Sequence, residues 1–346
     1  MNRSLARLGM LAAVVLVAAG CGGGGERKSS NPVAGTTTAE GGIKVGLVTD
    51  VGGLNDRGFN HLAYVGVQEA KQRLGATFRV FLSSSSAEYV PNLAQFARQH
   101  YDLTIGVGFT EADSIDTAAT RFPDEKFAIV DVDQTTEKHK PKNLLGLLFK
   151  EQEVGYLAGY LAALEEKRRP GPDVIGSVGG QSQPPVDRFI AGYQAGAKAA
   201  DPDIKVLNGY SQDFSDQQKC KELALNQIAD GAGVVFQVAG GCGLGTLEAA
   251  KEKGVWGIGV DADQSFLGPH ILTSATKRVD TAVYLAIKSV KDGTFKGGNV
   301  TYGLKDNGVG LGKISPRVPA SDVAKVQKIR ADIIGGKIRN IPTLVK

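Results

Sequence analysis

Cysteine and histidine are scarce in this chain of 346 residues, which has three of the former and four of the latter. The histidines are scattered along the sequence and show no spacing that is typical of metal ligands. They are His61, His100, His139 and His270. The sequence therefore predicts no metal site, and we expect no cofactor.

Clustered basic residues are also missing. The formal net charge is only +4, and the lysines and arginines are dispersed among acidic residues instead of forming a long run. Proteins that bind nucleic acid normally present a basic patch that neutralises phosphate groups. Nucleic acid is therefore disfavoured as a partner.

The N-terminal apolar segment is too short to cross a membrane. It covers residues 8–19 without a charge and follows Arg3 and Arg7, whereas a spanning helix needs about 20 apolar residues. This pattern is typical of a secretory signal peptide. The next residues, Ala18-Ala19-Gly20-Cys21, resemble the bacterial lipobox, in which a peptidase cuts before a cysteine that receives lipid.

We therefore expect residues 1–20 to be a lipoprotein signal peptide and Cys21 to carry acyl chains such as palmitate. Such chains would hold the protein outside the cytoplasm, on the cell membrane, without a transmembrane helix. The alternative is an ordinary cleaved signal peptide, in which case Cys21 is an incidental thiol.

Residues 21–42 are rich in glycine, serine and threonine and predict a flexible linker. Folding is expected to begin at Ile43, which leaves about 300 residues, more than one hydrophobic core usually spans. After Cys21 only Cys220 and Cys242 remain. In an oxidising compartment such an even pair favours a disulfide, and two buried thiols are the alternative.

From Ile43 onward, short β-branched segments alternate with amphipathic segments of helical length. In the first half we predict strands at 43–48, 78–82, 103–107, 127–132 and 144–149, and helices at 60–74, 91–100 and 111–121. This alternation favours an α/β fold with a parallel, doubly wound sheet.

The same alternation then starts again. We predict helices at 152–167, 186–200, 215–230 and 245–253, and strands at 174–178, 205–210, 234–238, 257–260 and 271–274. Three further segments, at 279–292, 300–304 and 320–335, suit a chain that crosses back between two lobes near its end.

Two consecutive α/β units with late crossovers describe the type I periplasmic-binding-protein fold. In that fold two doubly wound parallel-sheet lobes are joined by crossovers, and a ligand cleft lies between them. We expect the first lobe to hold residues 43–145 and about 276–303, and the second lobe to hold 146–275 and about 304–346.

Acids and glycines recur where the predicted strands end. Asp50, Asp131 and Asp261 each follow a strand, as does Gly240, and Lys277 lies at a predicted crossover. A single acid there is often only a helix cap or a turn residue, but the recurrence in both lobes favours a binding site. A carboxylate at a strand end suits a ribose, because it can accept two hydrogen bonds from the 2′,3′-diol.

Two phenylalanines are placed to offer flat faces to a base from opposite lobes. Phe59 follows the first loop, and Phe236 lies near the end of a strand. Stacking a base on an aromatic ring contributes about 1–3 kcal/mol in proteins that bind single strands. Either phenylalanine alone is more often part of a core.

Several ordered motifs lie along the folded part. They are Val48-Thr49-Asp50 with Asn55-Asp56-Arg57-Gly58-Phe59-Asn60; Phe149 with Glu153 and Leu157-Ala158-Gly159-Tyr160; Gly179-Gly180 with Pro184, Phe189 and Gly192-Tyr193; Phe236-Gln237-Val238-Ala239-Gly240-Gly241; Ile258-Gly259-Val260-Asp261-Ala262-Asp263-Gln264; and Thr273-Ser274 with Lys277 and Val279-Asp280. Over residues 43–312 they resemble the basic membrane protein family of ABC-transporter substrate-binding lipoproteins, which includes purine-nucleoside receptors.

The resemblance implies where a nucleoside would lie. The base would be held between Phe59 and Phe236, with Asp50 and Asp131 close to it and Asn60 nearby. The acid that binds the ribose would be Asp261, and the lysine of the second lobe would be Lys277. Asn55 and Gly240, from the same motifs, complete the candidate set.

The resemblance also implies a binding protein that makes and breaks no bond. It would act as a monomer and deliver its ligand to an ABC permease and ATPase complex. Three alternatives stay open: a receptor for a sugar or another polyol, a ligand sensor for a signalling partner, and a nucleoside hydrolase that uses the clustered carboxylates to activate water. The chain shows no catalytic signature that would support the hydrolase.

Overall fold

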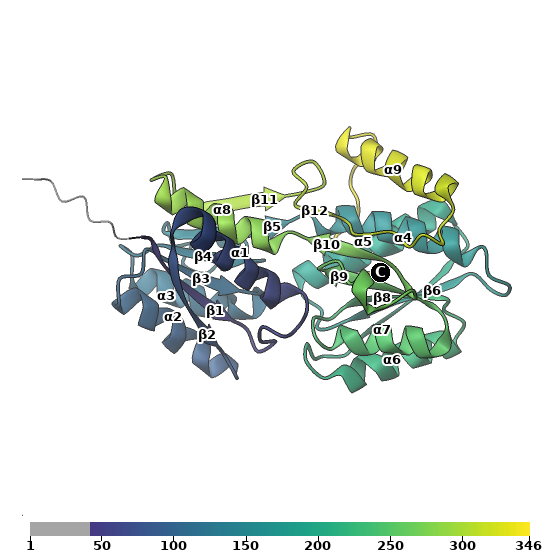
Figure 1. Cartoon of the computed structure of the whole chain (residues 1–346), viewed down its shortest axis with the longest axis horizontal. Coiled ribbons are helices and arrows are strands. Elements are labelled where there is room, and N and C mark those ends of the chain that lie inside the picture. Colours follow the sequence, from purple (N-terminus) through teal and green to yellow (C-terminus); the bar gives the residue numbers. More distant parts are fainter. Residues whose placement is uncertain (1–41) are drawn as a thin grey trace, which may run out of the picture. The chain divides into compact units, whose positions relative to one another are not determined.

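The computed structural model describes residues 42–346. The predicted signal peptide, the lipidation site Cys21 and nearly all of the predicted linker lie outside the described residues. The described part contains two six-stranded sheets, each with helices on both faces (Figure 1). No helix in this part is long and apolar enough to cross a membrane. The fold is therefore α/β with two parallel-sheet lobes, as predicted from the alternation of strands and helices.

The sheet of the first lobe has the strand order β11-β5-β4-β3-β1-β2, and all its neighbours are parallel. Its strands are β1 (Lys44–Thr49), β2 (Thr77–Leu82), β3 (Leu103–Val107), β4 (Phe127–Val130), β5 (Leu144–Phe149) and β11 (Gly298–Tyr302). The helices of this lobe are α1 (Phe59–Leu74), α2 (Tyr89–Arg98), α3 (Ala112–Arg121) and α8 (Val279–Lys291). Helices α1 and α8 pack together, as do α2 and α3.

The sheet of the second lobe repeats this order as β12-β10-β9-β8-β6-β7. Its strands are β6 (Val174–Gly179), β7 (Lys205–Tyr210), β8 (Val234–Val238), β9 (Trp256–Asp261), β10 (Ile271–Lys277) and β12 (Val309–Leu311). Its helices are α4 (Glu151–Glu166), α5 (Pro184–Ala200), α6 (Gln217–Ala229), α7 (Gly243–Lys253) and α9 (Ala320–Ile334). The edge strand β12 runs antiparallel to β10.

Strand β1 shows why the central strands read as continuous apolar segments. Val45 and Leu47 pack into the core on the side of α1, and Val48 packs into the separate core that includes residues of α2 and α3. Because successive side chains of a strand point to opposite faces, a strand that is covered on both faces has no polar side. The five residues of β1 after Lys44 are accordingly all buried.

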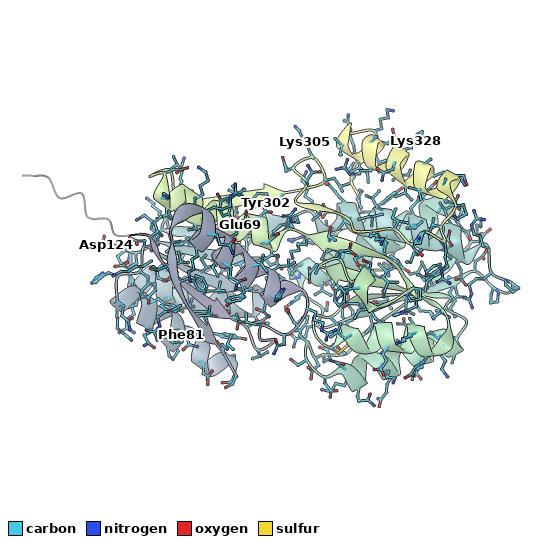
Figure 2. All side chains as sticks on the ribbon, viewed as in Figure 1. Glu69, Phe81, Asp124, Tyr302, Lys305 and Lys328 are labelled. Carbon is cyan, nitrogen blue, oxygen red and sulfur yellow. A yellow bond between two sulfur atoms is a disulfide. The ribbon has the colours of Figure 1, made fainter. Side chains whose placement is uncertain are left out.

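The chain passes between the two sheets three times, from β5 to α4, from β10 to α8 and from β11 to β12. Two of these crossovers place a charged residue at a lobe boundary, namely Glu151 at the start of α4 and Lys277 at the end of β10. At the first and third crossovers the rings of Phe149 and Tyr302 lie 5.5 Å apart. Tyr302 is labelled in Figure 2.

Helices α4 and α5 approach each other at backbone distance. Gly155 and Gly159 of α4 face backbone atoms of Phe189 and Tyr193, and a Cβ atom at either glycine would overlap them. Gly192 and Gly196 of α5 make the reciprocal contacts with the backbone of α4. Only glycine permits this separation, so the four positions fix how α5, which carries Phe189, lies against the crossover helix α4.

Several segment bounds differ from the sequence prediction, and three of the differences have a structural cause. Strand β4 ends at Val130 and not at residue 132, because Asp131 has a left-handed backbone with φ 72°. Strand β10 continues to Lys277, beyond the predicted end at residue 274, because its last residues pair with β12. Strand β12 itself was not predicted, since three residues are too short to show a periodic pattern.

Candidate functional site

A cavity that is partly open to solvent lies at the carboxyl ends of strands from both sheets. This is the place where open α/β sheets bind ligands. It is lined by Asp50, Gly52, Asp56, Phe59, Asn60, Gly108, Phe109, Asp131, Gln183, Pro185, Val186, Phe189, Phe214, Val238, Gly240, Gly241, Val260, Asp261 and Lys277. Seven of the nine predicted ligand-binding residues are in this set, all except Asn55 and Phe236.

Asp50 and Asn60 form the part of the wall that follows β1. The Asn60 side-chain amide donates a hydrogen bond to Asp50 Oδ1 at 2.7 Å, and the Gly52 backbone N–H donates to the same oxygen at 2.9 Å. Burial raises the pKa of Asp50 to about 6, although these hydrogen bonds act in the opposite direction. Asn60 Oδ1 is buried and has no partner among the described residues, so it is an acceptor available to a ligand.

Asp56 lines the cavity but mainly organises the first loop. Its carboxylate accepts hydrogen bonds from the backbone N–H groups of Gly58 at 3.0 Å, Asn60 at 2.6 Å and His61 at 3.1 Å. These bonds satisfy N–H groups at the start of α1, which has no other side-chain cap. Asp56 was not among the predicted ligand-binding residues, although an acid shortly before a helix is a recognisable capping signal.

Lys277 is buried in the floor of the cavity, with only 1% of its surface exposed. Its ammonium group lies 2.6 Å from Asp131 Oδ2 and 3.1 Å from Glu151 Oε1. Burial alone would lower the pKa of Lys277, but the surrounding carboxylates of Asp131, Glu151 and Asp261 raise it. The lysine is therefore a fixed cation that joins the first lobe, the crossover helix and the end of β10.

Three aromatic rings surround the same ammonium group. Their centroids lie 5.1 Å away for Phe59, 5.0 Å for Phe149 and 5.8 Å for Phe189. At such distances a ring attracts a cation through its quadrupole. Phe59 and Phe189 also line the cavity, one from each lobe, so the lysine holds two opposed aromatic residues near one point.

Asp131 and Asp261 occupy matching places in the two lobes, after β4 and at the end of β9. Both have a left-handed backbone, with φ 72° and 62°, which is uncommon outside glycine. Asp131 Oδ1 is buried without a hydrogen-bond partner in the described part of the chain. Burial raises the pKa of Asp261 to about 7, although Lys277 acts to lower it. Carboxylate oxygens from both lobes are thus free to accept hydrogen bonds in the cavity.

Phe236, the aromatic residue predicted to hold a base from the second lobe, lies in the core of that lobe. This residue is completely buried in the middle of β8 and packs on Tyr193, with ring centroids 5.1 Å apart, and on Phe189 at 6.2 Å. It does not line the cavity, because only residues from Val238 onward reach the end of the strand. The aromatic residues that the second lobe does present are Phe189 and Phe214.

Asn55, another predicted ligand contact, does not line this cavity. It is exposed and lines a separate surface pocket with Arg57, Gln217 and Lys251. Its neighbours in the loop reach the cavity instead, namely Gly52 and Asp56. In this irregular loop, adjacent residues differ in whether their side chains line the cavity. Sequence periodicity does not show which of them do.

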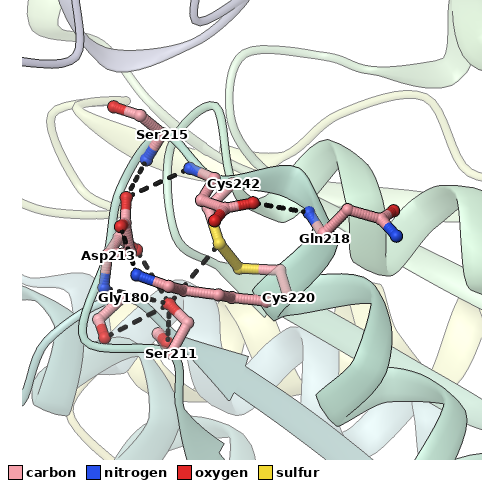
Figure 3. Close-up of polar contacts among 10 residues, drawn as sticks. Gly180, Ser211, Asp213, Ser215, Gln218, Cys220 and Cys242 are labelled. Carbon is pink, nitrogen blue, oxygen red and sulfur yellow. Dashed lines mark hydrogen bonds and ion pairs between the residues drawn. A yellow bond between two sulfur atoms is a disulfide. The ribbon is translucent and has the colours of Figure 1, made fainter.

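The second-lobe wall is built from glycines and one aromatic ring. The ring of Phe214 occupies the space that a side chain would take at Gly180, so glycine is required there. Gly240, with φ 54°, and Gly241 lie against the carbonyl oxygen of Phe214. Behind this wall a disulfide joins Cys220 to Cys242 (Figure 3). Of the two states that the sequence left open for these cysteines, the structure therefore has the bonded one.

No group of three or more histidine, cysteine, aspartate or glutamate side chains within residues 42–346 is arranged to hold a metal ion. The site can therefore be described by its hydrogen-bond acceptors, its one cation and its aromatic faces. Such a set of features is suited to a small polar ligand with at least one flat apolar surface.

Comparison with known proteins gives a consistent result. Residues 43–342 match the family described as ABC transporter substrate-binding protein PnrA-like. An ABC transporter nucleoside-binding protein of Lactococcus lactis is 37% identical over 86% of this chain and 88% of its own length. A lipoprotein of Pyrococcus horikoshii is 40% identical over 78% and 68%. A solute-binding protein of an ABC transporter system from Aeropyrum pernix superposes with a TM-score of 0.79 at 29% identity, covering 87% of this chain and 94% of its own.

Proposed function

This chain belongs to the PnrA-like family of ABC-transporter substrate-binding proteins, and from that premise we propose that its cavity binds a nucleoside and delivers it to an ABC permease. The observation that carries the proposal is that aromatic residues from both lobes surround Lys277, and that buried oxygen atoms in the same cavity have no hydrogen-bond partner among the described residues. The relative from Lactococcus lactis, named a nucleoside-binding protein, supports the same class of ligand.

The base is proposed to lie between Phe59 of the first lobe and Phe189 or Phe214 of the second. Phe59 and Phe189 are both within 6 Å of one atom, Lys277 Nζ. A base in contact with a ring on each side needs the two rings about 7 Å apart, twice the contact distance between carbon atoms.

The ribose is proposed to be held by Asp261. This carboxylate lines the cavity and has no hydrogen-bond partner among the side chains and backbone of the described residues. An ionised carboxylate can accept both hydroxyl protons of a 2′,3′-diol. Asp131 Oδ1 and Asn60 Oδ1 provide further acceptors for N–H or O–H groups of the ligand.

The charge of the cavity favours a nucleoside over a nucleotide. Four aspartates line it, against one lysine whose ammonium is already paired with Asp131 and Glu151. A phosphate group would add negative charge next to these carboxylates in a poorly solvated space, where like charges repel strongly. Neutral nucleosides are therefore the expected ligands.

A thermal-shift screen over nucleosides, nucleotides, free bases and sugars tests this proposal. A ligand that binds only the folded protein raises its melting temperature by linkage. Nucleosides are expected to stabilise the protein, and the matching 5′-monophosphates are expected to have no effect. Stabilisation by sugars and by no nucleoside would refute the proposal, and release of free base during incubation would indicate a hydrolase.

Two substitutions test which residues bind the ligand. Phe59→Ala and Asp261→Ala are each expected to weaken nucleoside binding at least about tenfold, measured by titration calorimetry. The matched controls are Phe81→Ala and Asp263→Ala, which alter similar side chains that do not line the cavity. Native affinity in both cavity variants would mean that the ligand lies elsewhere.

We further propose that Cys21 is lipidated and tethers the protein outside the cytoplasm. The relative from Pyrococcus horikoshii is named a lipoprotein. Metabolic labelling with an alkyne fatty acid should mark the natural chain and not Cys21→Ala, and the variant should be released into the soluble fraction. Labelling of both proteins would exclude Cys21 as the attachment site.

A further inference from the structure

The disulfide between Cys220 and Cys242 lies directly behind the cavity wall of the second lobe. Cys220 is in the first turn of α6, and Cys242 immediately precedes α7. Neither cysteine lines the cavity, and both are completely buried. The segments that they join do line it, through Phe214 on one side and Gly240 and Gly241 on the other.

We infer that this disulfide is a positioning element for the cavity wall, which here means the segment 211–216 and the turn Gly240–Gly241. Its loss is expected to weaken ligand binding by disordering the wall, beyond what a general loss of stability would cause. The effect on nucleoside affinity rests on the proposed function, whereas the effect on the order of the wall does not.

The segment 211–216 is hydrogen-bonded to the end of β6 and to Cys242, which precedes α7. The backbone N–H groups of Ser211 and Gln212 donate to the carbonyl oxygens of Gly179 and Gly180, at 2.9 and 2.8 Å. The N–H of Cys242 donates to the carbonyl oxygen of Phe214 at 2.9 Å. The Ser211 hydroxyl also lies within hydrogen-bond distance of the carbonyl oxygens of Gly179 and Gly180, at 3.3 and 3.5 Å. The bonds of Asp213 are local to the segment and to the start of α6, as with the N–H of Ser215 (Figure 3).

The turn opposite this segment has two glycines in sequence. Gly240 and Gly241 have the broadest backbone freedom of any residue type, so they lose the most conformational entropy when a wall is ordered. The Cys242 sulfur, which follows directly, is bonded to α6 and also lies 3.5 Å from Ser211 Oγ. The disulfide thus restrains the segment 211–216 and the turn Gly240–Gly241 at one point.

Such restraint acts on affinity because a ligand does not have to order a wall that is already ordered. The burial of both sulfurs also indicates a permanent restraint rather than a redox switch, since thiol–disulfide exchange requires access to a sulfur. The chemistry invoked is only the presence or absence of the bond, and no reaction occurs in the functioning protein.

Amide hydrogen exchange of the ligand-free protein tests the wall directly. The comparison is between the natural chain, Cys220→Ala/Cys242→Ala, and the control Val326→Ala, which removes buried volume in α9 outside the cavity. The amides at positions 212 and 242 are expected to exchange about tenfold faster in the disulfide-free variant and to stay protected in the control. Unchanged protection at both amides would overturn the inference, whatever ligand binds.

Nucleoside affinity gives the second measurement, made well below the melting temperature of every variant. The disulfide-free variant is expected to bind about five- to tenfold more weakly, and the control about equally to the natural chain. Phe214→Ala is expected to weaken binding about tenfold with the disulfide and about threefold without it, because the ring is then already displaced. If the losses of binding free energy from Phe214→Ala and from removal of the disulfide simply added up, the positioning role would be contradicted.

The two proposals fail in different ways. Faster exchange in the wall together with no nucleoside binding by any form would refute the proposed function and leave the role of the disulfide standing. If the double-alanine variant does not fold, the natural chain refolded with and without reductant provides the same comparison. Failure of both disulfide-free forms to fold would mean that the bond is needed for folding itself and would overturn the positioning role.

Discussion

The two lobes share one strand order but contribute different chemistry to the cavity. The first lobe supplies Asp50, Asn60 and Asp131, and its aromatic contribution includes Phe59. The second lobe supplies mainly glycines and apolar side chains, with Phe189 and Phe214 as its rings. A repeated scaffold therefore fixes which strand ends reach the cavity, while the residues at those ends determine what each lobe can recognise.

One pair of residues is the same in both lobes. Asp131 and Asp261 follow equivalent strands with the same left-handed backbone conformation. Their surroundings nevertheless differ, because Asp131 is paired with Lys277 at 2.6 Å, whereas Asp261 has no ion pair among the described residues. Equivalent carboxylates thus have separate roles, with one tied to the lobe boundary and the other free for a ligand.

The largest expected effect comes from removing the cation between the lobes. Lys277→Met leaves Asp131 and Glu151 buried without their partner and should lower the free energy of unfolding by about 3–5 kcal/mol. Urea denaturation measures this loss. Lys219→Met, which breaks an exposed pair with Asp213, is the control and should cost far less, because exposed ion pairs contribute little to stability. Equal losses would show that burial of the Lys277 network does not matter.

The next largest effect is a pH dependence of the free energy of unfolding, caused by the Asp261 carboxylate of the second lobe. The pKa of Asp261 is about 7 in the folded protein, against 3.8 for an ordinary aspartate. Ionising it therefore costs folded-state stability, with no penalty below about pH 4 and the full penalty above about pH 7. Asp261→Asn should accordingly be more stable than the natural chain at pH 8, by roughly 2–4 kcal/mol. That advantage should shrink towards pH 4 in urea titrations, and a constant advantage would contradict the raised pKa.

A smaller effect separates core aromatics from cavity aromatics. Phe236→Leu should lower the free energy of unfolding by about 1–3 kcal/mol, because the ring is buried against Tyr193 and Phe189. Nucleoside affinity should stay within about threefold, because this ring does not line the cavity. Calorimetry and denaturation on the same samples provide both values. A large loss of affinity at unchanged stability would return Phe236 to the binding site.

The smallest effect concerns an exposed contact between the lobes. Arg57 of the first loop lies 6.0 Å from the ring of Phe266, in the short helix η4 (Ser265–Leu267) of the second lobe. An exposed contact of this kind contributes about 0.5–1 kcal/mol, so Arg57→Ala should speed ligand release about two- to fourfold in stopped-flow measurements. Arg73→Ala, whose ring partner Tyr284 is in the same lobe, should leave release unchanged.

Most of the fold could be predicted because its strands are covered on both faces and its helices are amphipathic. The missed strand β12 has only three residues, and its pairing with β10 depends on a crossover far along the chain. The acids at strand ends were found because their position follows from the strand itself. Phe236 was predicted to contact a base but lies in the core, because a shift of two residues along β8, to Val238, decides between core and cavity. Phe189 and Phe214, which line the cavity, were not predicted as ligand contacts.

The glycines between α4 and α5 have a consequence for how this protein can change over time. At Gly155, Gly159, Gly192 and Gly196 even a methyl group would force the two helices apart. Helix α5 carries Phe189, so such a shift would also displace a ring next to Lys277. A mutational scan should therefore find that these four glycines do not tolerate substitution, although none of them lines the cavity. Divergence in ligand preference would then proceed through the loops at the strand ends, while this helix pair stays unaltered.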